Sequence, residues 1–340
     1  MPCLFGTVID KNGVIMMKKK TKIITAASAV LGCAVAACGV FAAYKHKSEA
    51  FTPSPDEWEL TFEDNFDTFD TTKWKVNMHG ESNIRRAAYH SNDDDIVFTK
   101  DGNLHIRTVW KDGVYGEGWY TSYLESSQSI HKEYESDPNY KGFSQTGGYF
   151  EIRCKVPYAK GIWSAFWLMP DNEIAFSEND VQWSGEDGLE IDIMESPNVY
   201  QKSKRAQNQN IHVIHADGYD ERLKTIRSNS IHVPKMYDEF HTYSLLWDED
   251  KYTFFIDGKK TWETKHIYEN RDMGICKVPE YLLLTTEVAG SIEDGKIYEG
   301  KVRNGETGEW EDFWCGNPAD NDKSKSYDFV VDYVRCYKRK

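Results

Sequence analysis

The sequence predicts an all-β fold, an antiparallel sandwich or barrel, from about Trp58 to the end of the chain. Short runs rich in Val, Ile, Tyr, Phe and Trp recur there and are separated by turn signals. One example is Asp101-Gly102, which stands between the apolar runs 96–98 and 104–107. Asp-Gly between apolar runs is a strong hairpin signal, and many strands at regular turn spacing are typical of sandwiches and barrels. Neither an internal repeat nor a long amphipathic helix is visible.

The same reasoning gives the later elements in order. Strands are predicted at 148–156 and 252–256, where β-branched and aromatic residues are dense. A last strand is predicted at 329–337. Residues 291–325 are polar and glycine-rich, so we expect a long loop before that strand.

Composition and charge narrow the class of protein. The 340 residues include 11 Trp and 20 Tyr, which suits a thick core or a cleft lined for stacking on sugar rings. The net charge is −14, and no basic stripe appears beyond a short amino-terminal cluster, so a nucleic-acid partner is not expected. The same sign weighs mildly against a heavily sulfated polysaccharide, although a local basic pocket could override it.

The amino-terminal part predicts export. Residues 23–44 form an apolar, Ala-rich stretch after three lysines, long enough to span a bilayer as a signal anchor. A cleaved signal peptide has the same order of residues, and the sequence ending at Cys38 resembles a bacterial lipoprotein signal. We therefore divide the chain into an export signal or membrane anchor at 1–47, a linker at 48–55 and one domain at 56–340. The expected location is extracellular or at the cell surface, with membrane contact through the amino-terminal segment only.

Four cysteines belong to the predicted domain, namely Cys154, Cys276, Cys315 and Cys336. Four cysteines allow three fully paired connectivities, among which a sequence cannot choose. Free buried thiols are an equal alternative in a core of this size. No spacing resembles a zinc site.

The segment 190–195 carries three carboxylates on one short apolar stretch. In a strand, Glu190 and Asp192 share a face and the isoleucines between them share the other. Glu195 would point the wrong way unless a β-bulge near Ile193-Met194 returns it to the Glu190 face, and bulges do occur beside active sites. Three acids on one face would raise at least one pKa, which suits a glycosidase that needs one ionised and one protonated carboxyl. The alternative is an ordinary half-exposed strand with its acids in water.

Several landmarks in sequence order resemble glycoside hydrolase family 16, and the resemblance covers the whole predicted domain. The acidic segment GLEIDIMESP lies at the distance expected of that family's catalytic motif. The other landmarks lie at 58–67, 73–74, 148–153, 161–170, 240–247, 255–258 and 331–335. The resemblance implies a concanavalin A-like jelly roll of two curved antiparallel sheets, with a sugar-binding cleft on the concave face.

The resemblance also implies a retaining mechanism on internal β-linkages of a polysaccharide. By match to the motif, Glu190 is the expected nucleophile, Glu195 the general acid and later the base, and Asp192 an assisting residue between them. Retention requires the two working carboxyl groups to lie about 5–5.5 Å apart, which neighbours on one bulged strand can reach.

Five further residues are expected at the cleft by family position. Glu151 and Arg153 share a face of one strand, with an exposed ion pair as the alternative. Trp163 is expected in the cleft wall, whereas Trp167, four residues later, is expected in the core. The last two, each with a purely structural role as the alternative, are His215 and Glu287.

Family members often hold one structural calcium ion far from the cleft. By resemblance, Asp332 would supply a carboxylate and Gly102 a backbone carbonyl, and oxygen ligands suit calcium. Its role would be stability, because the chemistry needs no metal or other cofactor.

Two departures from the family pattern leave the substrate open. The region 81–89 lacks the Asn-x-Glu-x-Gln stretch of many β-1,3-glucanases, and the usual Trp-Pro is Trp163-Ser164 here. Together, the acidic segment and the family resemblance still predict a monomeric endo-β-glycosidase acting on a β-1,3- or β-1,3-1,4-glucan. The alternatives are an endo-β-galactosidase on galactans or mucin-type glycans, a transglycosylase, and a non-catalytic lectin.

Overall fold

A computed structural model describes residues 51–77, 84–128, 137–171, 185–186, 188–196, 206–213, 224–265, 267–268, 271–272 and 274–340. The chain divides into two compact units, Met1–Lys47 and Ser48–Lys340, and all of the described residues belong to the second. The predicted export segment therefore lies outside the described residues. Within the described ranges, no helix is both long and apolar enough to cross a membrane.

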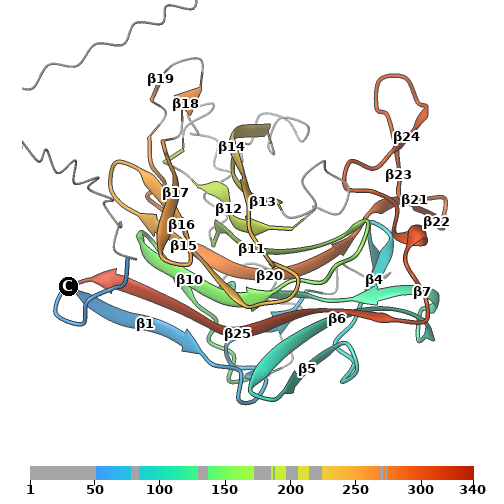
Figure 1. Cartoon of the computed structure of the whole chain (residues 1–340), viewed down its shortest axis with the longest axis horizontal. Coiled ribbons are helices and arrows are strands. Elements are labelled where there is room, and N and C mark those ends of the chain that lie inside the picture. Colours follow the sequence, from blue (N-terminus) through green and yellow to red (C-terminus); the bar gives the residue numbers. More distant parts are fainter. Residues whose placement is uncertain are drawn as a thin grey trace, which may run out of the picture. The chain divides into compact units, whose positions relative to one another are not determined.

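Two large sheets make up the domain, as the all-β prediction requires (Figure 1). The larger has 11 strands, in the order β17 (Lys259–Thr264), β16 (Tyr252–Ile256), β15 (His241–Trp247), β10 (Gly148–Lys155), β25 (Ser326–Arg339), β6 (Asn103–Gly113), β7 (Gly116–Thr121), β4 (Ala88–His90) and β3 (Ile84–Arg85), with β1 (Trp58–Asp64) beside β25 and β5 (Val97–Lys100) beside β6. The smaller has eight strands, in the order β14 (Lys224–His232), β13 (Ala206–Val213), β12 (Leu189–Glu195), β11 (Ile162–Pro170), β20 (Glu280–Val288), β8 (Tyr123–Glu125) and β2 (Lys75–Val76), with β9 (Ser144–Gln145) beside β20. Neighbouring strands are antiparallel in both sheets, except that β4 and β7 run parallel.

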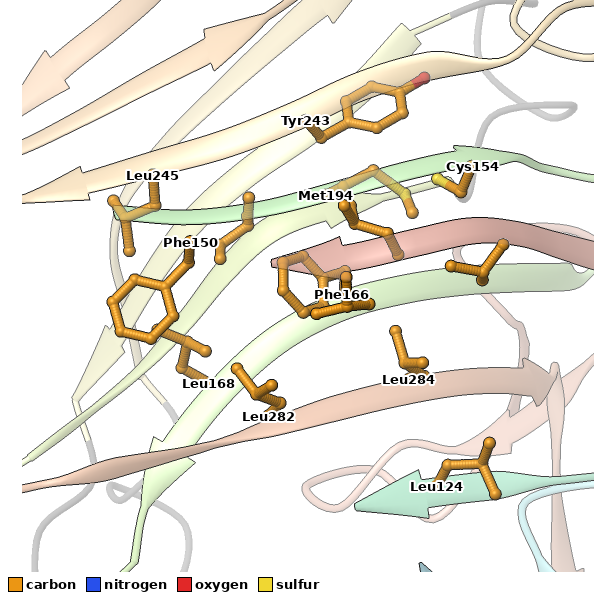
Figure 2. Close-up of a cluster of buried hydrophobic side chains, with 14 of the residues drawn as sticks. Leu124, Phe150, Cys154, Phe166, Leu168, Met194, Tyr243, Leu245, Leu282 and Leu284 are labelled. Atoms are coloured by element: carbon orange, nitrogen blue, oxygen red, sulfur yellow. The ribbon is translucent and has the colours of Figure 1, made fainter. Parts of the chain in front are cut away.

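The main core lies between the two sheets, because one side-chain face of each sheet enters a single apolar cluster. From the larger sheet, Phe150 and Ile152 of β10 and Leu245 of β15 contribute. From the smaller sheet, Phe166 and Leu168 of β11 contribute, and Figure 2 shows them with Phe150 and Leu245 between the strands. In a strand the alternate side chains point to opposite faces, so the residues between these positions face away from the core.

The segment predicted as a long loop at 291–325 contains short strands that the prediction missed. It forms two ribbons, β21 (Gly290–Glu293) with β22 (Lys296–Glu299) and β23 (Lys301–Arg303) with β24 (Trp310–Asp312), and then the 3₁₀ turn η4 (Pro318–Asp320). The turn between β21 and β22 is Asp294-Gly295, with φ of 52° and 72°. Asp-Gly is a hairpin signal, but the loop prediction rested on the polar composition of the segment and overlooked it. We call residues 290–316 the arm; its ribbons are at the right of Figure 1.

Part of the predicted linker packs onto the domain. The Phe51 amide donates a hydrogen bond to the Gly258 carbonyl at 2.8 Å. Its ring contacts the rings of Trp58, Tyr149 and Phe255 on the outer face of the larger sheet. Phe51, within the segment 48–55, is therefore part of the packed domain.

Four described cysteines, Cys154, Cys276, Cys315 and Cys336, are all buried free thiols. The sequence left disulfides and free thiols as alternatives, and the structure has these four cysteines as free thiols. Burial raises the pKa of the Cys154 and Cys336 thiols well above the usual range, so both stay protonated.

We predict that Phe150→Ala lowers the free energy of unfolding by about 3–5 kcal/mol, because it empties a fully buried core site. The measurement is urea-induced unfolding followed by circular dichroism. The matched control is Val114→Ala, whose side chain is 77% exposed and whose effect should stay within about 0.5 kcal/mol. Equal effects of the two substitutions would contradict this placement of the core.

Candidate active site

Strand β12 contains one extra residue relative to both of its neighbours. Against β11, Met194 pairs with Phe166 and Asp192 pairs with Trp167, so Ile193 has no partner residue. On the other side, Asp192 pairs with Asn210 of β13 and Glu195 pairs with Asn208. Three residue steps along β12 thus lie opposite only two along β13. The β-bulge predicted at Ile193-Met194 is therefore present.

The bulge places the three carboxylates of β12 on one face. Leu189, Ile191, Ile193 and Met194 all belong to the main core, and Figure 2 shows Met194 there among residues of both sheets. Two consecutive core residues, Ile193 and Met194, are possible only because the bulge interrupts the alternation. Glu190, Asp192 and Glu195 consequently share the opposite face, which we call the acid face. Asp192 is buried, and the two glutamates are half-buried.

Aromatic and apolar side chains form the floor of the acid face beside these carboxylates. Trp167 of β11 and Tyr123 of β8 meet edge to face at 5.9 Å and pack with Leu283 of β20. The Trp167 indole nitrogen donates a hydrogen bond to the Thr285 hydroxyl at 3.0 Å. Trp167 is thus buried, as expected, but under the site and not in the main core.

Trp163 lies on the acid face, as predicted, but is only 5% exposed. The Phe313 ring stacks on it at 5.8 Å, and Trp314 contacts it at 5.6 Å. The Arg86 guanidinium carbon lies 5.2 Å from the ring centroid. Residues of the arm thus cover much of the ring, and its role as a sugar-contacting wall stays a prediction.

Glu287, opposite Trp163 on β20, anchors two arginines. Arg85 donates to it at 2.7 Å, and Arg86 forms a second hydrogen bond to the other oxygen. Burial by itself would raise the pKa of Glu287, but the two guanidinium groups outweigh it and lower that pKa to about 2. Glu287 is therefore on the predicted face as a permanent anion that positions arginines, and it is unsuited to donate a proton.

Arg85 and Arg86 are site residues that the sequence reasoning missed. The attraction of Glu287 raises the pKa of Arg85 against the effect of burial, and the charge of Glu190 adds to the rise. Arg85 also lies over the Tyr123 ring, at 5.4 Å. A positive charge thus lies within electrostatic reach of Glu190. The signal available in the sequence was the Arg-Arg pair inside the region that departs from the glucanase pattern.

Glu151 and Arg153 are not at this site, and the expectation for them is wrong. Phe150 and Ile152 of β10 enter the core from the larger sheet, so Glu151 and Arg153 face outward from that sheet. Glu151 accepts hydrogen bonds from Tyr149 and Tyr333, each at 2.9 Å. The alternation of the strand correctly put Glu151 and Arg153 on one face but could not say which sheet the strand joins.

His215 lies outside the described residues. The strand after β12 ends at Val213, and its register puts His212 opposite Glu190. His212 is therefore the histidine that pairing brings next to the expected nucleophile.

A structural calcium ion at Asp332 and Gly102 stays a prediction. Val331 of β25 pairs with Leu104, so Asp332 follows beside the turn that contains Gly102. The donors are oxygen atoms of the right kind, but the Asp332 carboxylate forms an ion pair with Arg153. Calcium at this position would have to replace that pair.

Glu280 holds the beginning of the catalytic strand. It is fully buried on β20, and its carboxyl accepts a hydrogen bond from the Leu189 amide at 3.0 Å. Burial raises the pKa of Glu280 to about 8, although hydrogen bonds from Cys276 and Leu189 lower it in part. The adjacent Gly188 has φ of 127°, and a Cβ there would meet Pro170 at 2.2 Å. These contacts fix the residue immediately before Glu190.

Comparisons with known proteins identify the family of the chain. The family described as "Glycosyl hydrolases family 16" matches residues 121–301, which is more than half of the chain and includes β11, β12 and β20. The chain belongs to this family of glycoside hydrolases, enzymes that act on O-glycosyl bonds.

Individual relatives match more locally. A beta-glucanase of Rhodothermus marinus is 33% identical over 118 residues, which are 34% of this chain and 36% of that protein. A beta-1,3-glucan-binding protein of Penaeus monodon is 27% identical over 252 residues, which are 65% of this chain and 66% of that protein. The chain spans only part of the length of three curated relatives. It covers 36% of the Rhodothermus protein, and 27% and 35% of two others.

The fold has close counterparts among solved structures. SCLam, a non-specific endo-beta-1,3(4)-glucanase of family GH16, superposes with a TM-score of 0.59 at 21% identity, covering 85% of this chain and 94% of the other. The predicted concanavalin A-like jelly roll is thereby confirmed.

We predict that Glu280→Gln stabilises the protein increasingly as the pH rises from 5 to 8. The folded pKa of about 8 exceeds the ordinary value of 4.5. The contribution of Glu280 to the free energy of unfolding is therefore complete below pH 4.5 and is lost as the pH approaches 8. Glutamine keeps an acceptor for Leu189 and does not titrate. Urea unfolding at pH 5, 6.5 and 8 should show the difference between variant and wild type growing by up to about 1.4 kcal/mol per pH unit. The control is Glu186→Gln, an exposed carboxylate in the preceding turn; a trend equal to that control would refute the prediction.

For the calcium site, we predict that millimolar CaCl2 raises the melting temperature of the domain relative to EDTA, because a ligand that binds only the folded state stabilises it by mass action. The Asp332→Asn variant should lose the calcium response. An identical melting temperature with CaCl2 and EDTA would remove calcium from this position.

Proposed function

We propose that the protein is a retaining endo-β-glycosidase that hydrolyses internal linkages of a β-1,3- or β-1,3-1,4-glucan. The single observation that carries the proposal is the bulge in β12, which puts Glu190, Asp192 and Glu195 on one face outside the core. Membership of the glycoside hydrolase family supports the reaction class.

In this mechanism Glu190 attacks the anomeric carbon while Glu195 donates a proton to the departing glycosidic oxygen. The bond between the anomeric carbon and that oxygen breaks, and a covalent glycosyl-Glu190 ester forms. Glu195, now ionised, then removes a proton from water, which attacks the anomeric carbon and releases Glu190. Two inversions give a product with the original configuration. Asp192 is buried and lies between the two glutamates in the sequence of β12. It would hold a proton or a hydrogen bond during these steps.

The surroundings of Glu190 support its role as the nucleophile. The Arg85 guanidinium lies within electrostatic reach of Glu190 and is itself fixed by Glu287. A positive charge in this place favours a carboxylate that must be ionised before it can attack. Glu195, at the other end of the bulge, pairs in register with Ala165 of β11 and Asn208 of β13.

Two of the relatives support the substrate class in this proposal. The Rhodothermus beta-glucanase and the Penaeus beta-1,3-glucan-binding protein both point to β-glucans. A polysaccharide substrate fits an exported protein, and we propose export through residues 1–47 on the strength of the apolar segment 23–44.

A non-catalytic glucan-binding protein is the second candidate, and the match to the Penaeus binding protein favours it. Binding alone does not need three acids on one face with a bulge that aligns them. The presence of Glu190, Asp192 and Glu195 together therefore argues for catalysis.

We predict that the domain releases oligosaccharides from laminarin or mixed-linkage β-glucan, and that Glu190→Gln abolishes this release. Glu195→Gln should lower the rate by about 10²–10⁴-fold, the usual contribution of a general acid, and Asp192→Asn should lower it less. Product release is measured by reducing-end assay and chromatography on a panel that also contains agarose, carrageenan and mucin glycans. The matched control is Glu59→Gln, an exposed glutamate of β1.

Two outcomes of that panel, and one of a separate NMR measurement, would change the proposal. Release only from agarose, carrageenan or mucin would replace glucan with a galactose-based substrate and leave the mechanism intact. Binding without release, unchanged in Glu190→Gln, would make the protein a lectin. ¹H NMR of the first product should show the β-anomer, and an α-anomer would rule out retention.

A further inference from the structure

A pocket of about 620 Å³ lies at the end of the domain that carries the carboxyl terminus. Five segments of the chain line it: the start of β1, the turn before β10, the end of β15, residues 275–277 and the end of β25. Figure 1 shows the end of β25 at the left of the view and the arm at the right. Among the described residues that line the pocket, none belongs to the acid face. The pocket is therefore separate from the candidate active site.

The turn between β9 and β10 forms one fixed wall of this pocket. Gly147 and Gly148 have φ of 66° and 110°, and a Cβ at Gly148 would meet the Tyr337 carbonyl oxygen at 2.2 Å. The side-chain amide of Gln145 donates hydrogen bonds to the carbonyls of Gly147 and Tyr337, at 2.8 Å and 3.1 Å. A wall that is already ordered lowers the entropic cost of binding a ligand.

Residues 275–277 form a second fixed wall. The Cys276 amide donates a hydrogen bond to the Tyr252 hydroxyl at 2.9 Å, and the Lys277 amide donates to the Glu186 carbonyl at 2.9 Å. The Lys277 ammonium also pairs with the Glu186 carboxylate at 2.7 Å. These contacts join the wall to the turn that precedes β12.

The interior of the pocket offers apolar surface. Trp247, Ile275 and Cys276 line it and are buried side chains. Trp58 lines it as well, and the Arg339 guanidinium carbon lies 4.7 Å from the centroid of its six-membered neighbour ring system. Apolar walls with a few convergent polar groups, in a volume of this size, are the usual composition of a binding site for a small organic ligand.

The charged groups around the pocket balance one another. Arg339 lies 3.9 Å from the Asp248 carboxylate, and Lys277 is already paired outside the pocket. The remaining charged residues of the lining, Lys338 and Glu249, are both exposed and have opposite signs. The lining therefore favours neither an anion nor a cation, although it is rich in hydrogen-bonding groups.

We propose that this pocket is a second, non-catalytic carbohydrate-binding site, which takes a short segment of the polysaccharide away from the acid face. A pyranose is uncharged and combines apolar C–H faces with hydroxyl groups, which matches an apolar interior with balanced polar groups around it. This proposal rests on the proposed function, because its ligand is the polysaccharide on which the acid face acts. A polymer held in the pocket raises the effective concentration of further segments of the same chain at the catalytic strand.

The kinetic test compares polymeric and short substrates in Thr146→Trp, which fills the pocket from the turn before β10. On laminarin or mixed-linkage β-glucan, this variant should raise KM about tenfold with kcat unchanged, a modest share of the gain that linked sites can give. On laminaripentaose, which is too short to occupy both sites, KM should equal that of the wild type. An equal rise in KM for the polymer and the pentasaccharide would refute a second site.

A second variant keeps the test valid if the large side chain disturbs folding. Glu249→Ala together with Lys338→Ala removes two exposed polar groups of the lining, and its melting temperature should stay within about 2–4 °C of wild type. It should raise KM on the polymer in the same direction as Thr146→Trp. The matched control is Asp250→Ala, an exposed acid next to Glu249 that does not line the pocket and should leave KM unchanged.

Binding separates this proposal from the catalytic one. In affinity electrophoresis through polysaccharide gels, Glu190→Gln should be retarded, and adding Thr146→Trp should reduce the retardation. If all pocket variants migrate and turn over the polymer as Asp250→Ala does, the second site is refuted while the glycosidase stands. Retardation that Thr146→Trp reduces, in a protein whose wild type releases no product, would support the second site and refute the glycosidase.

A different ligand class would also overturn the proposal. The fluorescent probe 8-anilinonaphthalene-1-sulfonate is an apolar anion and reports occupancy of an apolar pocket. If it binds the wild type and not Thr146→Trp, while the retardation by polysaccharide is the same in both, the pocket is a site for apolar anions and not for carbohydrate.

Discussion

The site depends on one extra residue in strand β12. Without the bulge at Ile193, Glu195 would point into the core and Met194 would point out of it. The core enforces the bulge, because Ile193 and Met194 both belong to the main apolar cluster, where burial of each side chain contributes about 1.5–3 kcal/mol. Hydrophobic packing on one face of the sheet therefore determines the spacing of the carboxylates on the other.

The strand that carries the bulge is held at both ends by polar contacts from neighbouring strands. At its start, the buried Glu280 carboxyl accepts the Leu189 amide, and Gly188 packs against Pro170. At its end, Ser196 exchanges hydrogen bonds with Ser164 of β11. Because interiors are close-packed, a strand fixed in this way cannot slip without breaking these contacts. The positions of Glu190 and Glu195 thus depend on groups that never meet a substrate.

Charge on the acid face is organised around Glu287. This carboxylate anchors Arg85 and Arg86, and its low pKa follows from their proximity. A buried charge with one partner removed is costly, so the three groups are best regarded as one unit. Arg85 extends the unit toward Tyr123 and Glu190, while Arg86 extends it toward Trp163 and the arm. The electrostatics of the nucleophile and the shape of the cleft wall are therefore linked through one glutamate.

The sequence by itself determined the fold class, the strand that carries the acids and the need for a bulge at Ile193-Met194, since each follows from local alternation and turn chemistry. It could not place Glu151 and Arg153, because alternation gives the shared face of a strand but not the sheet that the strand joins. It also gave no sign that Phe313 and Trp314 would reach Trp163, about 150 residues earlier in the chain. Only the tertiary structure decided these points, because long-range strand pairing and packing, not neighbouring residues, bring such groups together.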